Sequence, residues 1–117
     1  MRNDGTRVLL VEDEAIIRMD FVVGLENLGF DVIEANAAAT ALGLLDAGLV
    51  IDVLVTDIDM PGDMNGLALA REVRRRCASC RIIVMSGHST PESDEMPERS
   101  VFLPKPLSPH DLAAAFT

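Results

Sequence analysis

The 117-residue sequence contains no tryptophan and no tyrosine, only four phenylalanines and only two cysteines. Without Trp and Tyr it lacks the aromatic platform on which nucleic acid bases stack. Two cysteines are too few for the disulfide framework of a small secreted protein, so a reducing cytoplasm is the expected location. No apolar run approaches the roughly 20 residues of a membrane span, and the polar residues 1–6 do not resemble a secretory signal.

Basic residues are also scarce, since 10 Lys and Arg stand against 19 Asp and Glu, for a net charge of −9. This balance argues against direct binding to nucleic acid or to anionic membranes. The four arginines between Arg71 and Arg76 fit a helix end, where cations complement the helix dipole. The length and the 49% apolar content predict one α/β domain over residues 1–117.

Apolar patterning alternates between strand and helix five times along the chain. Buried, β-rich runs predict strands at Val8–Val11, Phe30–Ala35, Val53–Thr56, Arg81–Met85 and Val101–Leu103. Helical spacing and caps predict helices over Ala15–Leu28, over Ala37–Ala47 behind an Asn36 cap, over Leu67–Arg76, and after Ser108. Right-handed crossovers between such units give a doubly wound parallel sheet.

Polar side chains follow four of the five predicted strands. They are Glu12, Asp13, Asp57, Ser86 and Lys105. In doubly wound sheets ligands bind beyond the carboxyl ends of the strands, so these groups should converge. Crowded carboxylates call for a hard cation such as Mg²⁺, and a lysine with a hydroxyl nearby suits a phosphoryl group. One carboxylate could act as nucleophile and carry the phosphoryl group as an aspartyl phosphate.

Four motifs occur in a fixed order: VLLVED at Val8–Asp13, VTDIDMPG at Val55–Gly62, VMSG at Val84–Gly87 and FLPKP at Phe102–Pro106. With them, nearly the whole chain resembles the receiver domain of bacterial two-component response regulators. The resemblance implies a flavodoxin-like fold with strand order 2-1-3-4-5. It also implies a phosphorelay function, in which a histidine kinase or a histidine phosphotransfer protein supplies the phosphoryl group. The phosphorylated form would then switch the affinity for a downstream protein target.

By the same resemblance Asp57 is the phosphoacceptor and Mg²⁺ is the cofactor. Asp13 and Asp57 would bind the metal directly, Glu12 mainly through water, and Asp59 through its backbone carbonyl. Lys105 would bind a phosphoryl oxygen, and the peptide bond between Lys105 and Pro106 would be cis.

The remaining roles implied by the resemblance concern the switch and the lifetime of the phosphoryl group. Ser86 and Phe102 would move together as the switch pair, and Gly87 would leave room for the phosphodonor. Asp59 and His88 occupy positions that tune how long the phosphoryl group persists. The resemblance thus implies a signalling domain, monomeric or weakly dimeric, that stands alone or belongs to a larger protein. It would phosphorylate itself from a donor and lose the group slowly, without being an enzyme in the usual sense.

Two stretches depart from the family pattern. The loop Pro61–Gly66 is one residue longer than usual, and the stretch between Gly87 and Phe102 is shorter and poor in apolar residues. The family's fourth helix would lie there. Since Ser89–Ser100 holds two prolines and a single apolar residue, we expect a shortened or irregular helix, at most one turn. We also expect phosphorylation to change order in this segment more than in the first three helices.

Two other functions compete with this interpretation. Asp57-Ile58-Asp59 is a D-x-D sequence, as in Mg²⁺-dependent phosphatases of the haloacid dehalogenase type or, together with Glu12, in toprim nucleases and primases. The phosphatase motif follows the first strand, however, and a toprim site leaves Ser86 and Lys105 unexplained. A binding module that needs no phosphate is the second alternative, and the intact acidic set argues against it.

Cys77-Ala78-Ser79-Cys80 has the spacing of a redox motif. Such motifs normally follow a strand and open a helix, which lowers the pKa of the thiol. This one follows a predicted helix and precedes a strand, so we expect no redox role.

Overall fold

One parallel five-stranded sheet forms the centre of the molecule. The computed structural model describes residues 5–116. Its strands are β1 (Arg7–Val11), β2 (Asp31–Ala35), β3 (Val53–Asp57), β4 (Arg81–Ser86) and β5 (Ser100–Pro104). They run in the order β2-β1-β3-β4-β5, and every neighbouring pair is parallel. The predicted doubly wound sheet and its strand order are confirmed.

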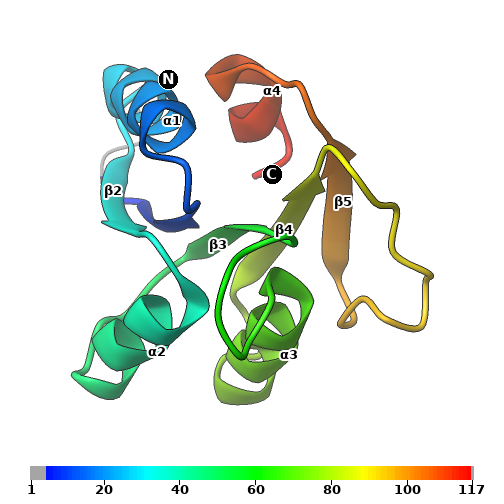
Figure 1. Ribbon diagram of the computed structural model, residues 1–117. Helices are drawn as coiled ribbons and strands as arrows, with labels where there is room; N and C mark the ends of the chain where they lie inside the picture. The colour runs from blue at the N-terminus through cyan, green and yellow to red at the C-terminus, as the bar shows by residue number, and fades with distance from the viewer. Residues whose placement is uncertain (1–4, 117) are drawn as a thin grey trace.

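Four helices cover the two faces of this sheet. They are α1 (Ala15–Asn27), α2 (Ala38–Asp46), α3 (Gly66–Arg76) and α4 (Pro109–Ala114). Figure 1 shows α1 and α4 on one side of the sheet and α2 and α3 on the other. None of the helices in the described part of the chain has the length and apolar character needed to span a bilayer.

Each face of the sheet has its own apolar core, because successive side chains of a strand point to opposite faces. On β1, Val8 and Leu10 pack with the side chains of α1 and α4, whereas Leu9 and Val11 pack with those of α2 and α3. All four are fully buried. Continuous apolar runs in the sequence therefore reflect strands that are covered on both sides.

The connection from β4 to β5 contains no helix in the described chain, so the strand–helix alternation breaks there. Residues 87–99 form turns, with one short hydrogen-bonded turn in which the Glu95 N–H donates to the Glu92 carbonyl at 3.0 Å. In Figure 1 this segment is the long yellow loop beside β5. The expectation of at most one helical turn is confirmed. The repeated pattern of five strand–helix units was wrong at this point, because the segment has too few apolar residues to dock a helix.

Arginine side chains of α3 hold this loop instead. Arg71 Nη1 donates to the carbonyl of Glu95 at 2.8 Å, and Arg74 Nε donates to the carbonyl of Glu98 at 3.1 Å. Met96 is the apolar anchor of the loop and packs against the core on the α2–α3 face.

The helix caps agree with the sequence at α4 but not at α2. The predicted helix after Ser108 is present as α4, and Ser108 and Asp111 form a capping box at its start. At α2, the predicted Asn36 cap is wrong: Ala37 is the N-cap residue, and Asn36 Oδ1 accepts a hydrogen bond from Thr40 Oγ1 at 3.1 Å. Asn36 lies one residue too early for its amide oxygen to reach the free backbone N–H groups of the first turn.

Candidate functional site

Three carboxylates meet at the carboxyl edge of the sheet. Glu12 and Asp13 follow β1, Asp57 ends β3, and one oxygen atom from each lies within 4.8 Å of the other two. The parallel register brings these residues together, because Val11 of β1 pairs with Thr56 of β3 and the acids directly follow these two residues. Glu12 is fully buried and Asp57 is 6% exposed, while Asp13 is half-buried. The sequence prediction that these three acids converge is confirmed.

Lys105 lies between two of these carboxylates. Its Nζ is 2.7 Å from Glu12 Oε1 and 3.2 Å from Asp57 Oδ2. It follows β5 and precedes Pro106 through a cis peptide bond, as predicted. The contact with Glu12 was not predicted. It arises because a buried carboxylate needs a cation or hydrogen-bond donors nearby.

Burial governs the acid–base properties of the cluster. It raises the pKa of Glu12 and of Asp57, and the hydrogen bond and charge of Lys105 oppose the rise at both. Burial also disfavours the ammonium form of Lys105, but the two carboxylates outweigh it and raise the pKa of Lys105. Lys105 compensates two acids of a three-acid cluster, and the carboxylate oxygens of that cluster are the ligands that a hard divalent cation prefers.

Ser86, at the end of β4, is tied to its neighbours through its hydroxyl group. Its Oγ donates to Asp59 Oδ2 at 2.9 Å and accepts the backbone N–H of His88 at 3.1 Å and of Ser89 at 3.0 Å. The Asp59 carboxylate therefore points to Ser86 rather than joining the acidic cluster. The exposed His88 contacts Ser86 through its backbone.

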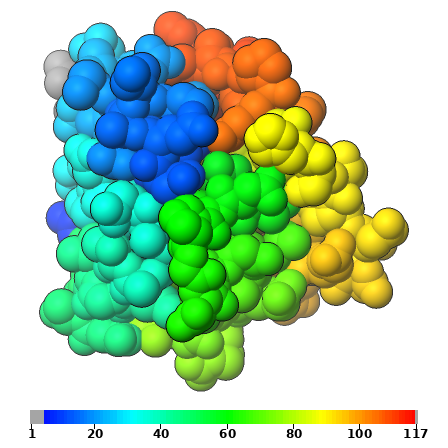
Figure 2. Space-filling view, viewed as in Figure 1, coloured from blue at the N-terminus to red at the C-terminus, as the bar shows by residue number. Residues whose placement is uncertain are grey.

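A small cavity opens over these groups, with a volume of about 210 Å³. Its lining residues are Asp13, Glu14, Ile17, Asp57, Asp59, Gly87, His88 and Lys105. Figure 2 shows the segments that follow β1, β3 and β4, in blue, green and yellow, meeting on one face of the molecule. Most of the site residues named from the sequence thus border one open space.

Phe102 lies away from this space. It is half-buried on β5, paired with Val84 of β4, and packs against the core on the α2–α3 face. The structure therefore links Ser86 to the cavity through its hydrogen bond to Asp59, whereas Phe102 packs in the core.

Sequence reasoning missed Arg18 on α1. Its Nη1 donates to the carbonyl of Glu12 at 2.8 Å, and its Nε donates to Glu34 Oε1 at 2.9 Å. These bonds fix the backbone between Glu12 and Asp13. No local motif identifies Arg18, because its role depends on how α1 packs beside β2.

A larger groove adjoins the acidic cavity, between α1 and the β5–α4 connection. Its volume is about 610 Å³, and its lining residues are Ile16, Ile17, Asp20, Phe21, Gly87, Lys105, Pro106 and Leu107. Ile16 is 84% exposed beside it. Gly87 and Lys105 border both spaces, so the groove opens directly onto the acidic site.

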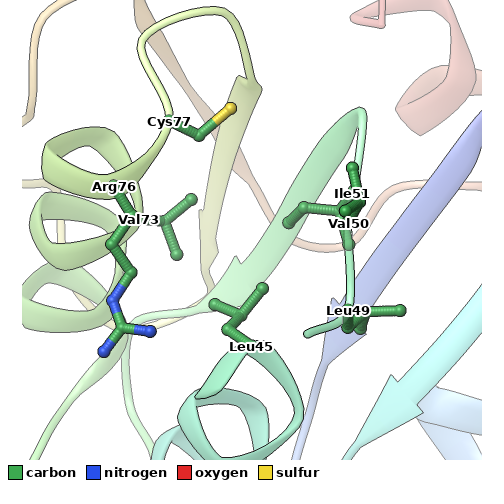
Figure 3. Close-up of a pocket in the computed structure, with 7 residues that line it drawn as sticks. All are labelled: Leu45, Leu49, Val50, Ile51, Val73, Arg76 and Cys77. Carbon is green, nitrogen blue, oxygen red and sulfur yellow. The ribbon is translucent and has the colours of Figure 1, made fainter. Parts of the chain in front are cut away.

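Another cavity lies between α2 and α3, with a volume of about 250 Å³. Figure 3 shows Leu45, Ile51 and Val73 around this space, with Arg76 and Cys77 at its border. It is mainly apolar and contains no carboxylate among its described lining residues, so it offers no ligands for a divalent cation.

Comparison with known proteins agrees with this geometry. A family model described as the response regulator receiver domain matches residues 8–117. The chain is 37% identical over 110 residues to the sensor kinase CckA of Brucella abortus, covering 91% of this chain and 12% of that protein. It is 35% identical to a probable transcriptional regulatory protein of Picosynechococcus, covering 92% of this chain and 46% of that protein. The chain thus spans less than half the length of either relative.

Solved structures show the same likeness. A response regulator receiver protein from Sinorhizobium medicae superposes with a TM-score of 0.89 at 33% identity, covering 95% of this chain and 90% of that one. The receiver domain of the hybrid histidine kinase CckA gives a TM-score of 0.78 at 30% identity, covering 92% and 93%.

Proposed function

Because the chain belongs to the family of response regulator receiver domains, we propose that it accepts a phosphoryl group on Asp57. Phosphorelay receiver function is common to this family, and the family is a signalling phosphoacceptor rather than a classical enzyme. The assignment of residues to steps is our proposal for this chain. The donor we propose is a phosphohistidine on a histidine kinase or on a histidine phosphotransfer protein.

The position of Asp57 carries the proposal. Its carboxylate is nearly buried, borders the open cavity, and has the ammonium group of Lys105 3.2 Å from Oδ2. In the proposed step an Asp57 oxygen attacks phosphorus, the bond from phosphorus to the donor nitrogen breaks, and the imidazole leaves with the electron pair. The ammonium group of Lys105 then stabilises the negative charge on the phosphoryl oxygens.

Receiver domains bind Mg²⁺ through acidic residues, and this structure brings three such residues together. We assign the metal ligands to Glu12, Asp13 and Asp57, with the backbone carbonyl of Asp59 as a fourth. When bound, Mg²⁺ would supply the positive charge that the phosphoryl oxygens require. Arg18 keeps the Glu12 backbone in place while the side chains bind the cation.

We propose that the groove beside α1 receives the helix that carries the donor histidine. It is continuous with the acidic cavity through Gly87 and Lys105, so a helix seated there can present an imidazole to Asp57. The largely exposed Ile16 supplies apolar area for such a contact. Gly87 has no side chain to obstruct the approach, and a β-carbon there would meet only Lys105 at 3.6 Å.

The competing D-x-D enzyme interpretation is not supported. The motif follows β3 rather than the first strand, and the Asp59 carboxylate accepts a hydrogen bond from the Ser86 hydroxyl.

Incubation with Mg²⁺ and acetyl phosphate tests the assignment. The wild-type chain should gain one phosphoryl group that survives acid and is released by base. Asp57→Asn should gain none, because the amide is not a nucleophile. Asp63→Asn is the matched control, since Asp63 is exposed in the β3–α3 loop, and it should behave as the wild type. Incorporation of one phosphoryl group by Asp57→Asn would refute the assignment.

A further inference from the structure

Arginine is unevenly distributed in this acidic chain. Six of its nine arginines lie between positions 71 and 99. Three of them border a cavity of about 260 Å³, whose lining residues are Arg74, Ala78, Ser79, Cys80, Arg81 and Arg99. Arg81 begins β4 and Arg99 directly precedes β5. In a parallel sheet the amino ends of the strands share one edge, so this cavity lies opposite the acidic site.

The arginines around this cavity are not neutralised by carboxylates in the way that their neighbours are. On α3, Arg75 pairs with Glu72, and Arg76 pairs with Glu72 and with Asp46 at 2.7 Å each. Arg81, in contrast, is exposed and forms no ion pair within residues 5–116. Arg99 lies 3.6 Å from the exposed Glu98 carboxylate, a distance at which the pair is weak.

Arg74 supplies the fixed charge of the cavity. Its guanidinium donates to the carbonyls of Cys77 at 3.0 Å and Ala78 at 2.9 Å, and to those of Glu98 and Arg99 at 3.1 Å. All four acceptors are neutral, so the positive charge remains. These bonds also cover carbonyl oxygens at the C-terminal end of α3, which would otherwise repel an anion.

The backbone of Arg99 is held in an unfavourable conformation at the same place. Its φ angle is 55°, a region that residues other than glycine rarely adopt. Such a conformation persists only where surrounding bonds enforce it. Here the Arg99 carbonyl accepts from Arg74, and Ser100 Oγ donates to the Pro97 carbonyl at 2.5 Å. The loop thus holds Arg99 at the border of the cavity.

We propose that this cavity binds a small phosphate-bearing anion, held by Arg81 and Arg99 and by the charge of Arg74. Guanidinium groups bind phosphate through paired N–H donors, and two of these three have donors available. One water molecule occupies roughly 30 Å³ in the liquid, so a cavity of about 260 Å³ has room for several groups of that size. This is enough for a phosphoryl group with a few carbon atoms. It does not admit a dinucleotide. A net charge of −9 opposes a nucleic acid strand.

This site has a structural consequence for the β4–β5 loop. Arg74 and Arg99 both contribute to the bonds that hold the end of that loop on α3. A bound anion would draw the two guanidinium groups together and so reduce opening of the loop. The site lies at the other edge of the sheet from Asp57 and does not depend on phosphorylation there.

NMR titration of backbone amides with inorganic phosphate, and then with glycerol 1-phosphate, tests the proposal. The buffer should be free of divalent metals and held at constant ionic strength with chloride. We expect saturable shifts at Ser79, Arg81 and Arg99, and the same shifts in Asp57→Asn. Arg81→Gln and Arg99→Gln should each weaken binding about tenfold, the loss of one charged hydrogen bond. Arg75→Gln removes the same charge outside the cavity and should change affinity less than about twofold.

Three results would overturn the proposal. Shifts confined to Gly87 and Lys105 would place the anion at the acidic site. Equal weakening by Arg75→Gln, or equal shifts with chloride, would mean a general charge effect. Displacement of phosphate by a single-stranded oligonucleotide at lower concentration would identify a nucleic acid surface instead. Asp57→Asn separates this proposal from the phosphoacceptor assignment, because it abolishes phosphorylation and should leave the anion site unchanged.

Discussion

Lys105 Nζ lies closer to Glu12 Oε1, at 2.7 Å, than to Asp57 Oδ2, at 3.2 Å. The Glu12 side chain has no exposed surface, so this ammonium group is its nearest compensating charge. In the unphosphorylated protein Lys105 therefore stabilises a buried acid as well as facing Asp57, the proposed phosphoacceptor. A phosphoryl group on Asp57 would compete with Glu12 for the same ammonium group.

Removing Lys105 should therefore destabilise the fold as well as impair phosphorylation. Lys105→Ala leaves the Glu12 carboxylate buried without a cation, which we expect to lower the free energy of unfolding by about 3 kcal/mol. Adding Glu12→Gln to Lys105→Ala should recover much of that loss, since the fully buried Glu12 charge is then removed. Urea denaturation of the four proteins measures the coupling between the two residues. A coupling energy near zero would show that the contact contributes nothing.

Magnesium should stabilise the chain through the same carboxylates. Glu12, Asp13 and Asp57 repel one another, and a cation that binds only the folded state shifts unfolding by mass action. At a hundredfold excess over its Kd, Mg²⁺ should raise the free energy of unfolding by about 2.7 kcal/mol. Asp13→Asn should reduce this gain, whereas Asp94→Asn in the β4–β5 loop should not. Thermal unfolding with and without Mg²⁺ is the measurement, and a melting temperature that never changes would contradict the metal site.

Gly66 should be intolerant of any side chain. A β-carbon there would overlap the backbone oxygen of Asp57, where α3 begins against the end of β3. Gly66→Ala should therefore cost about 1–3 kcal/mol and displace Asp57, slowing phosphorylation. Gly43→Ala is the matched control: nothing lies within 4 Å of its β-carbon on α2, so the gain in helix propensity should leave stability equal or higher. Equal stability and equal phosphorylation rates for the two variants would contradict this role of Gly66.

The sheet and the acidic cluster could be predicted because they depend on local patterns. Apolar runs define the strands, and the parallel topology brings their carboxyl ends to one edge. Asp13 and Asp57 therefore meet although 44 positions separate them. The lack of a regular helix between β4 and β5 could also be predicted locally, because Met96 alone cannot form an apolar face.

Contacts made by long side chains between distant elements could not be predicted. Arg71 and Arg74 reach carbonyls of the β4–β5 loop, and Arg18 reaches the carbonyl of Glu12. Each contact depends on how two packed elements are placed, which no spacing in the sequence encodes. The prediction of an Asn36 cap was wrong for a smaller reason: the helix begins one residue later than the pattern indicated.

The two cysteines should differ in reactivity. Cys77 is partly buried, which disfavours its thiolate, but hydrogen bonds from Ser79 outweigh this and lower the pKa of Cys77. Burial raises the pKa of Cys80 to about 12. Iodoacetamide at neutral pH should therefore alkylate Cys77 well before Cys80 in the native protein, and both at similar rates in urea. Peptide mass spectrometry measures the alkylation of each cysteine. Rapid alkylation of Cys80 in the native protein would contradict the prediction and show that the segment between α3 and β4 opens.

Phosphorylation should change order in the β4–β5 loop more than in α1, α2 or α3. The hydroxyl of Ser86 accepts the backbone N–H groups of His88 and Ser89, so turning it toward a phosphoryl group on Asp57 removes two bonds at the start of the loop. The rest is held by arginine–carbonyl bonds and by Met96, which gives it low local stability. Hydrogen exchange with and without beryllium fluoride should show the largest difference within residues 89–100. Ser86→Ala should raise exchange there without the mimic and reduce the response to it. Equal protection of this segment in both states of the wild type would contradict the prediction, because the loop would then not respond to phosphorylation.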